Sequence, residues 1–312
     1  MKKNKERDKY LLKEQPQKID KLDFWSILAM IFTLVYLLAH FFWVYPVFGG
    51  ELNGRQLMKE SWDSYRAIPE EEEVIEIFTI PRPHQEWYTS KEAEVLLQNR
   101  SWSVTYKKII RQLRYKENGE DRIRVIFLEP PRDKDTAFLF WRHWGIGKAD
   151  DVWGWFSALR RIRRIASPDQ RDHFMGTALT FEDVRRLMGE NLNDFIITLA
   201  SEEELEGVEC YKIILEPKSE TNSAYGRREF WRVKNGLPSF LQIKYYNQKG
   251  DLIKAQRNSQ IYKFQPGVWR SRLVEMRNLK NNYTSLLYFI KREVKKFEDK
   301  IFKIQTLEQQ GR

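Results

Sequence analysis

Four arginines stand close together in the run LRRIRRI at residues 159–165. If this run is a strand, alternate side chains point to opposite faces, so arginines occupy both faces. A guanidinium group pairs well with carboxylates and phosphates and is costly to bury alone. We therefore expect some of them to pair with Glu182, Asp183 or Asp169, or to contact an anionic ligand; structural pairing is the preferred interpretation. The four are Arg160, Arg161, Arg163 and Arg164.

The residue types that enzymes use are present but do not form a known catalytic pattern. The sequence has no GxSxG, HExxH or Walker A motif, and Gly145-Ile146-Gly147-Lys148 is followed by Ala149 instead of Ser or Thr. His173 lies near Ser167 and Asp169, but proximity in sequence is not the geometry of a triad. A hydrolase is the least favoured hypothesis, and we predict no catalytic residue and no cofactor.

Metal sites and disulfides are not expected either. Glu70–Glu73 is interpreted as a solvated spacer, because calcium sites need carboxylates spaced around a turn together with carbonyl groups. Cys210 is the one cysteine, so neither an internal disulfide nor a CxxC metal site can form. It lies in the apolar run VECYKIIL, which predicts a small buried side chain.

An uncharged run of 25 residues, Phe24–Phe48, is long enough to cross a bilayer as a helix. Residues 1–23 hold eight Lys/Arg, whereas residues 51–76 hold three, so the N-terminus should stay in the cytoplasm. The sequence predicts a single-pass anchor in the inner membrane, with residues 49–312 outside the cytoplasm. A cleaved signal peptide with a site at Val47-Phe48-Gly49 is the alternative, but the long apolar run favours a retained anchor.

The remaining sequence predicts a mainly β domain. A helix is expected over residues 51–67, then an irregular acidic and proline-containing segment at 69–86, and a short helix at 181–189. Turn dipeptides such as Asn235-Gly236 and Lys249-Gly250 separate strand-like runs, which predicts antiparallel pairing. We expect one wide, curled antiparallel sheet of about ten or eleven strands, whose concave face something apolar must cover. Strands are expected over 102–115, 122–129, 137–144, 151–156, 159–165, 194–200, 208–216, 227–234, 238–247, 252–264, 268–280 and 283–294.

Several motifs resemble the outer membrane lipoprotein-sorting protein family, relatives of the periplasmic carrier LolA and its receptor LolB. They are the arginine run followed by Phe174-Met175-Gly176-Thr177 and Phe181-Glu182-Asp183, the stretch VIFLEPP at 125–131, and the pair Tyr245-Tyr246 before Gly250. The resemblance spans residues 102–298. It implies an incomplete antiparallel β-barrel with helices on its concave side, an apolar cavity that receives acyl chains, and a link to RND-type membrane transporters.

The resemblance also suggests where a ligand would bind. The cavity should be lined by one face of the segments 137–144, 151–156 and 234–246. Three features depart from the family pattern: the retained anchor, the segment at 69–86, and Asp135-Thr136 in place of a glycine. A tethered protein cannot shuttle, which favours handing lipid to or from a membrane partner. The candidate ligand-binding residues are Phe138, Phe140, Trp153, Trp155, Phe174 and Met175.

These observations predict five segments: a basic cytoplasmic tail (1–23), the anchor (24–48), a helix with an irregular stretch (49–101), the β-domain (102–298) and a C-terminal tail (299–312). The predicted function is binding a lipid or lipoprotein acyl chain during sorting toward the outer membrane, with a transporter as partner. The alternative is an accessory or scaffold module of an RND-type transporter whose aromatic core leaves no ligand cavity. The net charge of +10 suggests anionic head groups, an acidic partner or a merely solvated face, and nucleic acid is not expected.

Overall fold

The computed structural model describes residues 53–81, 83, 86–99, 105–116, 120–145, 148–166, 171–187 and 189–311. Residues Leu52–Arg312 form one compact unit. The predicted cytoplasmic tail and membrane anchor lie outside the described residues. Within the described ranges, the helices are too short or too polar to span a membrane.

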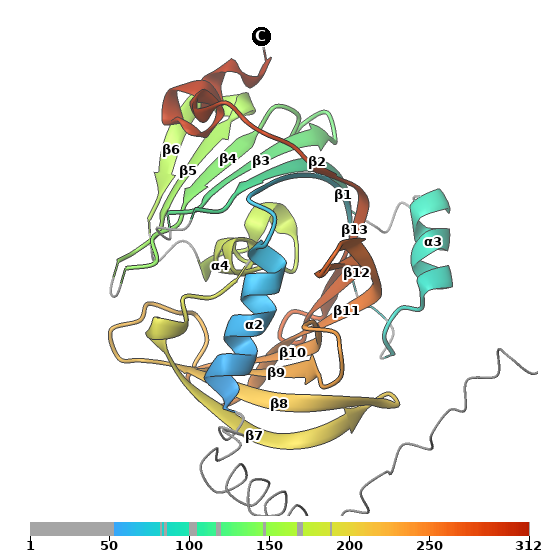
Figure 1. Cartoon of the computed structure of the whole chain (residues 1–312). Coiled ribbons are helices and arrows are strands. Elements are labelled where there is room, and N and C mark those ends of the chain that lie inside the picture. The colour runs from blue at the N-terminus through green and yellow to red at the C-terminus, as the bar shows by residue number, and fades with distance from the viewer. Residues whose placement is uncertain are drawn as a thin grey trace, which may run out of the picture. The chain divides into compact units, whose positions relative to one another are not determined.

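Within the described ranges, thirteen strands form a single antiparallel sheet in the order β6-β5-β4-β3-β2-β1-β13-β12-β11-β10-β9-β8-β7 (Figure 1). Strands that follow one another in sequence pair with each other, except β6 and β7, which form the two free edges of the sheet. The first strand, β1, also pairs with the last, β13. The strands are β1 (Glu70–Pro81), β2 (Thr105–Arg114), β3 (Arg122–Glu129), β4 (Ala137–Trp141), β5 (Asp151–Phe156), β6 (Arg161–Ile165), β7 (Phe195–Leu205), β8 (Val208–Pro217), β9 (Arg227–Val233), β10 (Phe240–Tyr246), β11 (Leu252–Gln265), β12 (Val268–Asn278) and β13 (Tyr283–Val294). The predicted mainly β, curled and open sheet is confirmed.

Two helices occupy the concave face of the sheet, and other segments cover its convex face (Figure 1). Helices α2 (Gly54–Arg66) and α4 (Phe181–Arg186) pack on the concave side, around the largest hydrophobic core. Helix α3 (Ser90–Asn99) packs outside β1, β12 and β13. The C-terminal 3₁₀ segments η5 (Asp299–Phe302) and η6 (Ile304–Gly311) cover β4 and β5 from outside. The sheet therefore has apolar contacts on both faces.

Strand β1 corrects the sequence prediction, which placed an irregular segment at 69–86 and a solvated spacer at Glu70–Glu73. The strand lies in the middle of the sheet, between β2 and β13. Its side chains alternate between the faces, and Glu71 and Glu73 are fully buried on the concave side. The prediction is wrong because arginines on neighbouring strands neutralise these carboxylates, which sequence composition alone does not show.

The remaining predicted elements agree closely with the structure. The helix expected at 51–67 is α2, and the one expected at 181–189 is α4, whose N-terminus is closed by a capping box between Thr180 and Asp183. Strand β6, which contains most of the arginine run, begins at Arg161 and not at residue 159 as predicted. The reason is that Ser157–Leu159 forms a 3₁₀ turn and Arg160 has a φ of 47°. Cys210 is buried, as expected.

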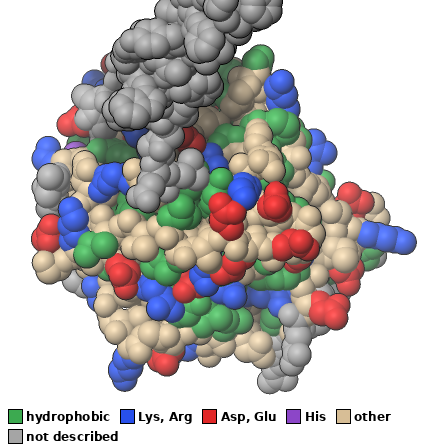
Figure 2. Space-filling model, turned by 60° about the horizontal axis from the view of Figure 1, so that its bottom comes forward, with side chains coloured by type: hydrophobic (Ala, Val, Ile, Leu, Met, Phe, Trp, Pro, Cys, Tyr) green, Lys and Arg blue, Asp and Glu red, His purple; other side chains and the backbone are tan. Residues whose placement is uncertain are grey.

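The surface carries both charge signs together. Figure 2 shows one face of the molecule, on which Lys and Arg side chains alternate with Asp and Glu without separating into patches of one sign. The basic excess of the sequence is therefore not gathered on this face.

Candidate functional site

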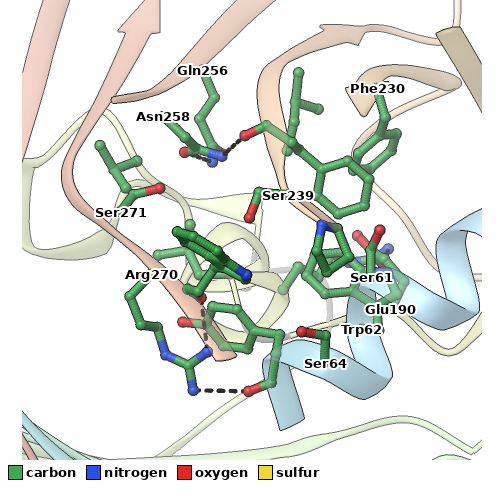
Figure 3. A pocket seen from close by; sticks show the side chains of 18 of the residues that line it. Ser61, Trp62, Ser64, Glu190, Phe230, Ser239, Gln256, Asn258, Arg270 and Ser271 are labelled. Atoms are coloured by element: carbon green, nitrogen blue, oxygen red, sulfur yellow. Dashed lines mark hydrogen bonds and ion pairs between the residues drawn. The ribbon is translucent and has the colours of Figure 1, made fainter. Parts of the chain in front are cut away.

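A cavity of about 80 Å³ lies between α2 and the concave face of β9–β13 (Figure 3). Helix α2 contributes Ser61, Trp62, Ser64 and Tyr65 to its wall. Ser61, Trp62 and Ser64 lie on the side opposite Arg270 (Figure 3), whereas the Tyr65 ring contacts Arg270 directly. Strand β10, one of the segments predicted to line a ligand cavity, contributes Phe240, Ile243 and Tyr245. The two other predicted segments, 137–144 and 151–156, do not reach this cavity.

Local sequence explains why α2 lies here. The Asn53 side chain accepts a hydrogen bond from the Gln56 backbone N–H and caps the helix. Leu57, Met58 and Trp62 are buried on one face of the helix. Gly54 fits tightly, since a Cβ at this position would lie 2.9 Å from the backbone nitrogen of Leu199 in β7. The helix is thus held against the sheet by its apolar face and by a close backbone approach at its start.

One part of the cavity wall is apolar. The rings of Trp62 and Phe240 lie 5.0 Å apart, and Phe230 and Phe240 lie 5.1 Å apart in an edge-to-face arrangement. Ile243 and Val274 complete this wall. An apolar cavity of about 150 Å³ holds a benzene molecule, so a space of about 80 Å³ is too small for an acyl chain. A long ligand would require α2 to move away from the sheet.

A group of buried charges forms another part of the wall. Arg111 on β2 and Arg292 on β13 both donate to the Glu73 carboxylate, at 2.5 Å and 2.8 Å between nitrogen and oxygen. Arg270 on β12 donates to Glu71 at 2.7 Å. Burial by itself would raise the pKa of Glu73, but Arg111 and Arg292 outweigh it and lower that pKa to about 2. The carboxylate is therefore ionised at neutral pH inside the protein.

A second buried network stands on the α4 side of the cavity. Asp183 accepts hydrogen bonds from Lys254 at 2.7 Å and from the Tyr225 hydroxyl at 2.7 Å. Arg186 donates to Glu190 at 2.6 Å and lies 2.9 Å from Glu182. Burial would raise the pKa of Glu182, but the neighbouring arginines, Arg186 first, lower it to about 2. This network fixes α4 on the sheet.

The structure separates the predicted ligand-binding residues onto two faces of the sheet. Phe138, Phe140 and Phe174 lie in the concave core, with the rings of Phe138 and Phe174 5.1 Å apart, and Met175 packs against them. Phe174 also lines a separate void of about 20 Å³. Trp153 and Trp155 pack on the convex face beneath the C-terminal segment. None of these residues lines the larger cavity, so their grouping into one site is corrected.

The structure corrects the predicted pairing of the arginine run with Glu182 and Asp183. Arg160, Arg161, Arg163 and Arg164 are exposed because β6 is an edge strand. Arg164 pairs with Asp151 on the neighbouring strand. The carboxylates of Glu182 and Asp183, proposed as partners, are instead held by Arg186 and Lys254. Asp169 lies outside the described residues.

His173 contacts a tyrosine. Its Nδ1 lies 2.8 Å from the Tyr283 hydroxyl, and its Nε2 lies 3.3 Å from the Asn281 amide nitrogen. Burial, followed by the charge of Lys254, lowers the pKa of His173. Of the neighbours in sequence considered for a triad with His173, Ser167 and Asp169 lie outside the described residues, and Asp172 is exposed.

The sequence analysis does not predict the charged residues around the cavity, because they come from distant strands. One signal was present: Glu71, Glu73, Ile75 and Ile77 alternate with period two, which is typical of a strand face. Reading that alternation through the acidic run would have predicted β1. The sequence gives no comparable sign that Arg111, Arg270 and Arg292 meet at these carboxylates.

Comparison with known proteins supports the fold. A family model described as "-like: Uncharacterized protein" matches residues 119–309, more than half of the chain, and the chain belongs to this family. No curated protein matches it.

Three crystal structures are similar over most of the chain. An outer membrane lipoprotein-sorting protein domain from Vibrio parahaemolyticus has a TM-score of 0.70 at 20% identity, covering 82% of this chain and 98% of that chain. A DUF1329 family protein from Desulfovibrio piger ATCC 29098 has a TM-score of 0.70 at 19% identity, covering 81% and 97%. A LolA superfamily protein from Nitrosomonas europaea has a TM-score of 0.59 at 15% identity, covering 81% and 99%. The chain therefore has the fold of the lipoprotein-sorting and LolA superfamily proteins, as the resemblance predicted.

Proposed function

We propose that this protein binds an acyl chain of a lipid or lipoprotein between α2 and the concave face of its sheet, and that it acts in sorting toward the outer membrane. The observation that carries the proposal is the cavity beneath α2, with Trp62, Phe230 and Phe240 in its wall. Similarity in fold to a lipoprotein-sorting protein domain supports it. Acyl binding would open the site by moving α2, since the closed cavity measures about 80 Å³.

The proposal includes anchoring of the protein in the inner membrane. Residues 24–48 would anchor the chain in the inner membrane, with the domain in the periplasm, and an RND-type transporter would receive or supply the lipid. The support is the uncharged run of the sequence and the excess of Lys/Arg before it. A stationary protein of this kind would pass lipid on at the membrane and would not carry it across the periplasm.

Photocrosslinking of a fatty acid tests the binding step. The full-length chain is purified in nanodiscs, and a photoreactive fatty acid is crosslinked to it and mapped by peptide mass spectrometry. We expect labels on β9 and β10, and we expect Ile243→Trp, which fills the cavity, to reduce them severalfold. Ile126→Trp on the convex face serves as a matched control, because Ile126 packs outside the sheet. Equal labelling of both variants and the wild type would exclude this site.

A second function has a specific observation in its favour. The concave face is largely filled by α2, α4 and aromatic side chains, which is the feature expected of an accessory or scaffold module without a ligand. In that case the chain would copurify with a transporter, and mass spectrometry of the complex would find no lipid beneath α2. The crosslinking experiment separates the two functions.

A further inference from the structure

We propose that the ligand of this cavity is an acyl amphiphile with an anionic group, a carboxylate or a phosphate, which binds at the cluster of Arg111, Arg270 and Arg292. This inference rests on the proposed function and narrows its ligand class. The arginine cluster would bind the anionic end of the ligand, whereas the apolar wall of the cavity would contact its acyl chain.

The first step is the balance of charge in the cluster. Three guanidinium groups, those of Arg111, Arg270 and Arg292, line the cavity, and two carboxylates, those of Glu71 and Glu73, pair with them. Each of the five side chains is at most 2% exposed. Within the described residues the cluster therefore holds one buried positive charge in excess. An uncompensated buried charge is strongly destabilising, and an anion would remove that penalty.

The second step is the presence of unused donors. Arg111 Nη2 and the Tyr115 hydroxyl are buried and have no hydrogen-bond partner among the described residues. Most buried polar groups do have partners, and each one left without costs about 1–3 kcal/mol. Arg111 lines both the larger cavity and the adjoining apolar void. It stands where a polar head and an apolar chain would meet.

The third step is the contrast with the α4 side. There the charges of Arg186, Arg228 and Lys254 pair with Glu182, Asp183 and Glu190. Arg142 and Arg185 share the Asp150 carboxylate beside this network, so basic groups outnumber acidic ones there too, but these two arginines line a separate polar pocket and not the cavity beneath α2. An anion inside the cavity is thus favoured at the β2–β12–β13 side. Cation–π contacts hold the favoured side in place, with Arg270 4.0 Å from the Tyr65 ring and Arg292 4.0 Å from the Phe289 ring.

The experiment compares ligands that differ only in charge. The full-length chain in phosphatidylcholine nanodiscs is photolabelled with a diazirine fatty acid or its methyl ester, and with the matched phosphatidic acid or diacylglycerol. Labelling of cavity peptides is normalised to that of the nanodisc scaffold protein. We expect at least one anionic probe to label them about tenfold more than its uncharged counterpart, as for a charge-assisted hydrogen bond. The probe that does so identifies the carboxylate or the phosphate.

Variants assign the preference to the cluster. Arg111→Gln should abolish the preference for the anionic probe while labelling by the uncharged probe continues, and Arg111→Lys should retain part of it. Arg228→Gln removes a buried arginine from the network on the α4 side and should leave the preference intact. If Arg111→Gln does not fold, Arg111→Lys assigns the preference to the cluster by weakening it, while the wild-type comparison of charged and uncharged probes tests whether the preference exists.

The experiment distinguishes failure of this inference from failure of the proposed acyl binding. Equal labelling of the cavity by charged and uncharged probes would overturn this inference and leave acyl binding standing. No labelling of the cavity by any probe would overturn acyl binding itself and the inference with it. A preference that survives Arg111→Gln but not Arg228→Gln would place the anion at the α4 side and also overturn the inference.

Discussion

Glu73 joins two arginines from different strands inside the sheet. It accepts from Arg111 on β2 and from Arg292 on β13, so one carboxylate on β1 ties together three neighbouring strands. Buried ion pairs contribute little net stability compared with apolar side chains, but removing one partner is costly. Such residues therefore specify which strands meet, and the same arginines supply the proposed anion site.

The pKa of Glu73 leads to a prediction about acid. Its value of about 2 in the folded chain lies below the ordinary value of 4.5, so its stabilising effect is complete above pH 4.5 and is lost as pH falls toward 2. This difference corresponds to on the order of 3 kcal/mol of unfolding free energy. Urea unfolding of the wild type and Glu73→Gln between pH 7 and pH 3 measures it. The variant should be less stable at pH 7 and should lose less on acidification, and parallel curves would contradict the assignment.

At the scale of elements, α2 covers the cavity, and the proposed acyl binding requires it to move. It rests on the concave face through Trp62 and through Ser61, whose hydroxyl accepts from Arg232 Nε at 2.9 Å. Its first residue, Gly54, lies directly against β7. A helix held by one apolar face and a few polar contacts can be displaced without unfolding the sheet, which acyl binding requires.

Gly54→Ala tests the seating of α2. The added Cβ would meet the backbone of β7, which cannot turn aside as a side chain could, so the start of the helix must shift. We expect a loss of unfolding free energy of about 1 kcal/mol or more, with faster hydrogen exchange in α2. Gln56→Ala on the exposed side of the same helix is the control and should change neither. If Gly54→Ala matches the wild type in both measurements, the close approach does not hold α2.

At the scale of the whole molecule, the sheet has two halves that meet at β1 and β13. The strands before α4 form β6 to β1, and those after it form β13 to β7, each mostly pairing neighbours in sequence. The long-range pairing of β1 with β13 joins the two halves into one sheet and brings α2 over the second half. The proposed position of the domain in the cell rests on residues 24–48, which lie outside the described residues.

Fractionation tests the anchor. The full-length chain, expressed in a Gram-negative host, should stay in the inner-membrane fraction with an intact mass that includes residues 24–48. Residues 52–312 placed behind a cleavable secretion signal should enter the soluble periplasmic fraction, because the apolar run would be absent. A mature N-terminus near Gly49 in the full-length chain would instead show that the run is a signal peptide.

The sequence by itself determined the elements that depend on local pattern. Strands β3, β5 and β13 were predicted to the residue, and β8 to β12 nearly so, because alternation and turn dipeptides act over a few residues. The motifs also indicated the superfamily fold. Tertiary structure alone decided that the acidic run is the central strand β1, that Trp153 faces away from Phe138, and that Arg111, Arg270 and Arg292 share one cavity. Burial of charge and the choice of sheet face depend on partners far away in the chain, and the physical reason is that only the folded sheet brings those partners within a few ångströms.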